Sequence, residues 1–63
     1  MTLSTVILSH LSNAEEIMGY HPSGARENIE FVKYLILQYP NTEVEVTTDE
    51  LNEQLTKFKS QEA

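Results

Sequence analysis

The sequence predicts an all-α fold, a small three-helix domain with a short extended segment between the second and third helices. Apolar residues recur every three or four positions in three separate segments, the spacing that places them on one face of a helix. Only one stretch, 43–47, alternates between apolar and polar residues as a β-strand does. A chain of 63 residues allows one domain, and it buries only about 60% of the surface that its unfolded form exposes. We therefore expect a single domain over residues 1–63, whose modest stability a partner subunit would increase.

The first helix is predicted over residues 2–18. Its apolar residues share one arc, and they are Leu3, Val6, Ile7, Leu11, Ala14, Ile17 and Met18. An alternative makes Thr5–Leu8 a short strand and starts the helix at the capping box Ser12–Glu15, whose hydroxyl and carboxylate would satisfy two backbone amides. We favour a single helix, because such a strand would have only the alternating stretch as a candidate partner.

The connection to the second helix is predicted at Gly19–Gly24. Gly19 follows the apolar face of the first helix and can adopt the positive φ that closes many helices. Pro22 and Ser23 are well placed to begin the next helix.

The second helix is predicted over residues 25–38. Its apolar face consists of Ala25, Ile29, Val32, Ile36 and Tyr39, widened by Phe31 and Leu35. The helix should end before Pro40, whose ring disfavours helical dihedral angles at the preceding residue. The first two helices are expected to form an antiparallel pair.

The third helix should follow the extended segment Glu43–Thr47. Within that segment the valines, Val44 and Val46, would point to one side and cover one end of the core. Thr47–Glu50 matches a capping box, and a narrow apolar seam of Leu51, Leu55 and Phe58 then extends to about Lys59. This helix is expected to pack across the first two through its seam, and the last few residues are expected to fray.

Composition disfavours several kinds of partner. The chain has no cysteine, so neither disulfides nor thiolate metal sites can stabilise it. Ten acidic against four basic residues give a formal net charge of −6, whereas proteins that bind nucleic acid directly usually present a basic face. The apolar run Val6–Leu8 is too short to span a bilayer, and the N-terminus lacks the basic segment of a signal peptide. We expect a cytoplasmic protein that binds neither nucleic acid nor membranes.

The chain contains no motif of a known catalytic chemistry. A nucleophile elbow, a kinase signature, a glycine-rich phosphate loop and a dinucleotide fingerprint are all missing from the sequence. His10 and His21 do not have the i, i+4 spacing of a helical metal pair, and so small a core leaves little room for a pocket of about 300 Å³. We therefore predict no enzyme, no cofactor and no metal. For His10 we favour a structural residue hydrogen-bonded to a carbonyl over a pH-sensitive interface residue or a ligand.

An anion site at the start of the second helix is an alternative for the loop. Ser23, Arg26 and the backbone amides of Gly24 and Ala25 would hold a phosphate or carboxylate at the positive end of that helix. Arg26 opposes the helix dipole there, so helix stability does not explain it. A serine at a helix start is ordinary capping, however, and we favour a plain corner between helices.

An acidic strip lies near the third helix. Its members fall within eleven positions without an intervening base, and they are Glu43, Glu45, Asp49, Glu50 and Glu53. Such a strip can face a basic partner or imitate phosphates. We favour simple helix electrostatics, because acids suit the start of a helix and Glu53 can pair with Lys57 one turn later.

Apolar residues also lie outside the predicted core faces. These are Leu8 on the first helix and Tyr34 and Leu37 on the second. A three-helix monomer would struggle to cover them, and two-fold pairing is the commonest way to do so. We predict a homodimer with these residues at its interface, in which segment 43–47 could also pair with its symmetry mate.

The chain begins MTLSTVILSHLSNAEEI, and it is short, acidic, free of cysteine and helical in pattern. In size and general character it resembles the small accessory proteins that lambdoid temperate bacteriophages carry in the early region between recombination and excision genes. The resemblance involves no diagnostic motif and carries over no functional residue. It implies a non-enzymatic modulator of host or phage machinery during the choice between lysis and lysogeny.

Three functions stay open at this point. In the first, the chain is a regulatory interaction module that binds itself and an unidentified protein. In the second, it is an acidic inhibitor that mimics nucleic acid and binds a basic protein. In the third, it is a small ligand- or anion-binding protein that uses Gly19–Arg26. The apolar surplus and the missing catalytic motifs favour the interaction module.

Overall fold

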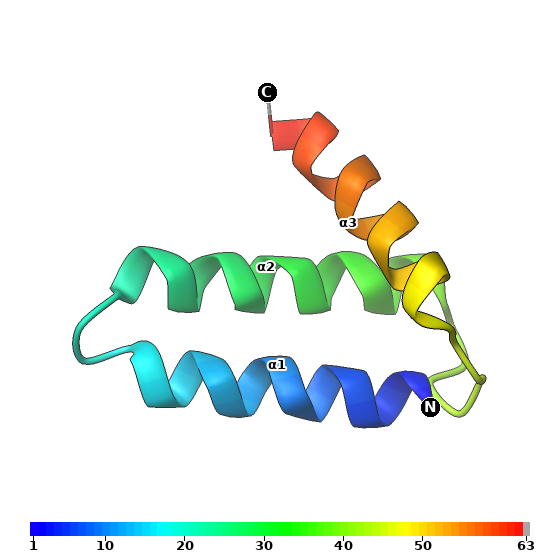
Figure 1. Ribbon diagram of the computed structural model, residues 1–63, viewed down its shortest axis with the longest axis horizontal. Coiled ribbons are helices and arrows are strands. Elements are labelled where there is room, and N and C mark those ends of the chain that lie inside the picture. The colour runs from blue at the N-terminus through cyan, green and yellow to red at the C-terminus, as the bar shows by residue number, and fades with distance from the viewer. Residues whose placement is uncertain (63) are drawn as a thin grey trace.

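The computed structural model describes residues 1–62, which form three helices, α1 (Leu3–Ile17), α2 (Pro22–Gln38) and α3 (Thr48–Glu62). α1 and α2 lie side by side in opposite directions, and α3 crosses the C-terminal end of α2 and then diverges from this hairpin (Figure 1). The described range contains no strand. The predicted all-α, three-helix fold is confirmed.

α1 is one continuous helix. Thr2 caps it, since its side-chain oxygen accepts a 3.4 Å hydrogen bond from the amide of Thr5. Ser12–Glu15 therefore lies inside a helix that has already begun at Leu3, and the alternative of a strand over Thr5–Leu8 is wrong.

The corner between α1 and α2 differs from the prediction in two ways. Gly19 does not have a positive φ; instead, the amides of Tyr20 and His21 both bond to the carbonyl of Ile17, at 3.1 and 2.7 Å. α2 begins at Pro22, the residue that the sequence marked as suited to a helix start, and so three residues before the predicted helical range that began at Ala25. The reason is that proline's fixed φ suits the first helical position, where its missing N–H is not needed.

The core lies between α1 and α2 and is closed at one end by the segment before α3. Its buried side chains are Leu3, Val6, Ile7, Phe31, Val32, Tyr34, Leu35, Val46 and Phe58. Leu3 and Leu35 are completely buried, and Ala14 and Ala25 are buried as well.

Two predictions for α2 were wrong. Tyr34, predicted at a dimer interface, is 8% exposed, and its ring lies 6.4 Å from that of Phe31 and 5.6 Å from that of Phe58. Ile36, predicted in the core, is 48% exposed. Both errors have one cause, namely that α3 covers one flank of α2 and leaves the other flank open.

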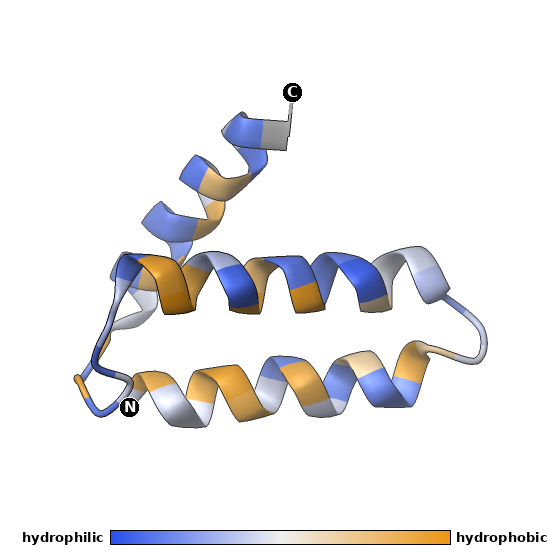
Figure 2. Cartoon of the chain, turned by 180° about the vertical axis from the view of Figure 1, so that it is seen from behind, coloured by the Kyte–Doolittle hydropathy of each residue, from blue (hydrophilic) through white to orange (hydrophobic). Residues whose placement is uncertain are grey.

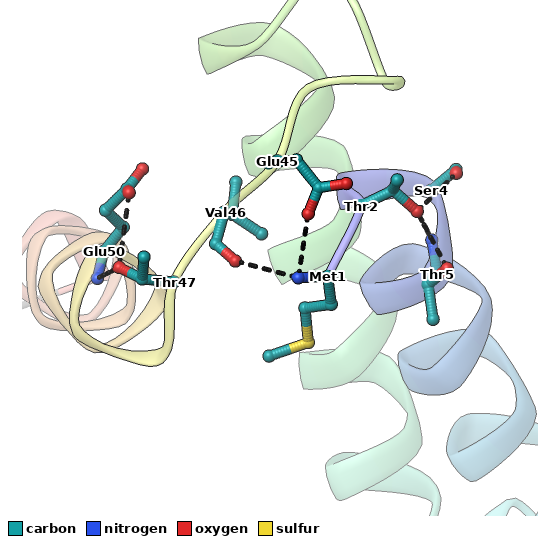
Figure 3. Close-up of polar contacts among 8 residues, drawn as sticks. All are labelled: Met1, Thr2, Ser4, Thr5, Glu45, Val46, Thr47 and Glu50. Carbon is teal, nitrogen blue, oxygen red and sulfur yellow. Dashed lines mark hydrogen bonds and ion pairs between the residues drawn. The ribbon is translucent and has the colours of Figure 1, made fainter.

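The segment between α2 and α3 is tied to the start of α1. Its backbone bonds join the amide of Leu3 to the carbonyl of Val44 at 2.9 Å and the amide of Val46 to the carbonyl of Met1 at 2.8 Å. The amino group of Met1 also lies 3.0 Å from the carboxylate of Glu45 and 3.4 Å from the carbonyl of Val46 (Figure 3). Val46 is buried and Glu45 is exposed, as the alternation predicted. These bonds lie within one chain, so the backbone pairing of this segment with a symmetry mate is not supported.

α3 starts as predicted and ends later. The amide of Glu50 donates to the hydroxyl oxygen of Thr47 at 3.1 Å, and that hydroxyl donates to the carboxylate of Glu50 at 3.2 Å (Figure 3). Thr47 and Glu50 therefore form the predicted cap, although the carboxylate accepts from the hydroxyl of Thr47 and not from its backbone amide as in the standard capping box. The helix runs to Glu62 rather than to about Lys59, and the fraying expected beyond it falls partly on residue 63, outside the described residues. Phe58 packs α3 against Phe31 of α2, and within the described residues the backbone of α3 comes close to α2 and not to α1. The prediction that α3 packs across both hairpin helices is therefore wrong.

Candidate interaction surfaces

A groove of about 330 Å³ lies between α3 and the hairpin. Its lining comes from all three helices and includes His10, Asn13, Ile17, Gly24, Glu27, Asn28, Phe31, Leu55, Phe58 and Lys59. The expectation of little room for a pocket of this size is therefore wrong. The divergence of α3, which the sequence pattern does not reveal, creates the space.

His10 forms part of the groove wall as a half-buried residue. Its Nδ1 lies 3.4 Å from Oδ1 of Asn28, the distance of a long hydrogen bond, and its ring is nearly perpendicular to that of Phe31, with centroids 5.3 Å apart. The partner atom is the side-chain carbonyl oxygen of Asn28, which agrees with the expected hydrogen bond to a carbonyl. Both contacts hold α1 against α2, which gives His10 a structural role.

The predicted anion loop is partly occupied by its own histidine. Ser23 and Arg26 are exposed, and Arg26 forms no ion pair among residues 1–62. The ring of His21 lies so close over Gly24 that a Cβ at that position would collide with it. Gly24 therefore accommodates a side chain of the protein itself. Among the described residues, no cluster of three or more histidines and acids could hold a metal ion.

The five residues of the acidic strip are all exposed, and three of them have intramolecular partners. Glu45 pairs with the amino group of Met1, and Glu50 completes the capping box of α3. Glu53 lies 3.4 Å from the ammonium of Lys57, one helical turn away. These contacts agree with the interpretation that the acids of the strip stabilise α3 and the segment before it, which we call the linker, through local charge interactions.

The flank of α2 away from α3 is apolar and uncovered. Successive residues of an α-helix are rotated by about 100°, so Tyr34 and Ile36 project to opposite flanks of Leu35. Tyr34 meets Phe58 of α3, and Ile36 must therefore project to the side that α3 leaves open. The sequence shows that α2 has more apolar residues than one face can hold, but it does not show which flank α3 would cover.

Leu8 of α1 projects to the same side of the hairpin. It follows buried Ile7 as Ile36 follows buried Leu35, and in two antiparallel helices that face each other the same rotation leads to the same side. Leu8 is 64% exposed. Half-buried residues on the same flanks extend the surface, and we name Leu8, Leu11, Ile29 and Ile36 the open face. Figure 2 shows the molecule from behind, with hydrophobic residues along both hairpin helices.

Leu37 is separate from the open face. It is 79% exposed and lies two positions, or about 200° of rotation, beyond Leu35. It therefore points away from α1. Of the three residues predicted at an interface, Leu8 and Leu37 are exposed but on different sides, and Tyr34 belongs to the core.

No family model, curated protein or solved structure matches the chain. Within residues 1–62, none of the helices combines the length and the hydrophobicity needed to cross a membrane.

Proposed function

We propose that this chain is a non-enzymatic regulatory module that acts by binding other proteins, and that it self-associates as a homodimer. The observation that carries the proposal is the open face, where apolar side chains from both hairpin helices are in contact with water. Exposed apolar side chains that gather on one side of a protein usually mark a site of protein–protein interaction.

A second copy of the chain suits the open face because helices are stable only when their apolar stripes are covered by another layer. Two hairpins that face each other across a two-fold axis would form a four-helix arrangement with both open faces inside. Burial of a leucine or isoleucine side chain contributes about 1.5–3 kcal/mol, so a few such residues per subunit supply a substantial driving force.

The regulatory part of the proposal is supported by the general character that the chain shares with accessory proteins of lambdoid phages. That resemblance implies a modulator of host or phage machinery that does not catalyse a reaction. The homodimer would then be the form that presents the remaining surfaces, α3 and the back of α2, to the regulated protein.

Sedimentation equilibrium at tens of micromolar tests the homodimer. The expected species has twice the 7.2 kDa mass of the chain. Ile36→Glu and Leu8→Glu should each convert it into a folded monomer, because a carboxylate would have to be buried without a partner. Leu37→Glu is the matched control and should leave the dimer intact.

A 7.2 kDa species at every concentration would overturn the homodimer. A dimer that Leu37→Glu dissociates while Ile36→Glu does not would move the interface to the back of α2.

A further inference from the structure

α3 is held to the hairpin by few interactions. Phe58 is the one residue of 48–61 that is buried, at 7% exposure, whereas Leu51 and Leu55 are half-buried. One side-chain hydrogen bond joins α3 to the hairpin within the described residues, from Nε2 of Gln54 to the hydroxyl of Tyr39 at 3.3 Å. α1 and α2, by contrast, enclose the completely buried Leu3 and Leu35.

The docked position of α3 also carries an unfavourable feature. Oε1 of Gln54 is buried and has no hydrogen-bond partner among the residues that the structure describes. A buried carbonyl without a partner loses the hydrogen bonds that water would provide, and it regains them when the surface opens. The groove beneath the second half of α3 further limits its packing against the hairpin.

The contacts that organise each part do not depend on the docked position. α3 has its own capping box and its own Glu53–Lys57 pair. Val46 covers the end of the hairpin where α1 begins and α2 ends, and its amide donates a hydrogen bond to the carbonyl of Met1. Thr47 lies between these two fixed points, so rotation at this one residue would swing α3 away and leave the hairpin closed.

We propose that α3 is a releasable arm, and that the aromatic surface it uncovers, Phe31 and Tyr34, binds an amphipathic helix of a partner protein. The chemistry of that helix follows from the helix now seated there, which presents apolar side chains at i, i+4 and i+7, namely Leu51, Leu55 and Phe58. The surface lies on the flank opposite the open face. The inference goes beyond the proposed dimer and stands whether or not the dimer forms.

Amide hydrogen exchange of the full chain, followed by NMR, tests the release. Local opening exposes amides without global unfolding, so residues 51–59 should exchange about tenfold or more faster than residues 31–35. Gln54→Met removes the buried carbonyl together with the hydrogen bond to Tyr39, so it should change the exchange rate in α3 alone. Gln61→Met is the matched control at an exposed position and should change nothing. Equal protection of the two segments, with no selective effect of Gln54→Met, would overturn the proposal.

The partner chemistry is tested with Phe58→Ala in the full chain, which should release the arm and leave α1 and α2 folded. A synthetic peptide of residues 47–61 should then shift the ring signals of Phe31 and Tyr34, and the same peptide with Phe58→Ala should not. The unmodified chain should show the same shifts at higher peptide concentration, because its own arm competes. Loss of the hairpin in the Phe58→Ala chain, or a folded hairpin whose rings do not respond to the peptide, would each overturn the proposal.

Discussion

Leu35 and Ile36 are adjacent aliphatic residues of α2, yet one is completely buried and the other is 48% exposed. Leu35→Ala should therefore lower the free energy of unfolding by on the order of 2–5 kcal/mol, comparable with the whole stability of so small a domain. Ile36→Ala should lower it by less than about 1 kcal/mol in the monomer, because little buried contact is lost. Urea denaturation followed by circular dichroism, at concentrations below dimer formation, measures both. Equal losses for the two variants would contradict the assignment of the two flanks.

Gly24 offers a second prediction at this scale. A methyl group there meets the ring of exposed His21, which must move aside, so Gly24→Ala should stabilise the chain by less than the roughly 1 kcal/mol by which alanine is normally the better helix former. The double variant His21→Ala with Gly24→Ala should recover that intrinsic gain. Thermal unfolding of the four chains of this cycle gives the coupling energy. The full gain from Gly24→Ala alone would show that the ring moves aside freely.

At the level of elements, α3 depends on its cap more than α1 or α2 does, because it is the least buried of the three helices. Thr47→Ala removes the capping box and should cost about 1 kcal/mol of helix stability. The loss should appear as faster amide exchange in residues 50–55 and leave residues 31–35 unchanged. Thr48→Ala is the control, since the neighbouring threonine has no part in the cap. Similar effects of the two substitutions would contradict a specific role for Thr47.

For the whole molecule, charge and apolar burial predict opposite responses to salt. Two chains of formal charge −6 repel each other. Salt weakens that repulsion, and at 0.1 M it largely screens exposed charges that are more than about 10 Å apart. A dimer formed through the open face should therefore keep or strengthen its association as sodium chloride is raised. Sedimentation equilibrium at low and high salt measures this. A dissociation constant that rises steeply with salt would instead indicate an interface formed by ion pairs, such as the acidic strip would make with basic residues.

Local physical chemistry accounts for what the sequence determined by itself. The three-to-four spacing of apolar residues located all three helices, Pro40 ended α2 at Gln38 as predicted, and the capping box at Thr47 placed the start of α3. The alternation of Val44 and Val46 with glutamates predicted which side chains of the linker face the core. Each of these features depends on residues within a few positions of one another, so each can be read from the chain.

Only the tertiary structure decided which flank of α2 is covered. The apolar residues of α2 occupy a wider arc than α1 alone can bury. The flank with Tyr34 and the flank with Ile36 can therefore be covered only by another element, and α3 covers one of them. The course of the linker decides the outcome, because its bonds to Met1 and Leu3 deliver α3 to the Tyr34 flank. Those bonds join residues more than forty positions apart, and no periodicity within either segment encodes them. The buried tyrosine, the groove beside α3 and the open face all follow from this one long-range choice.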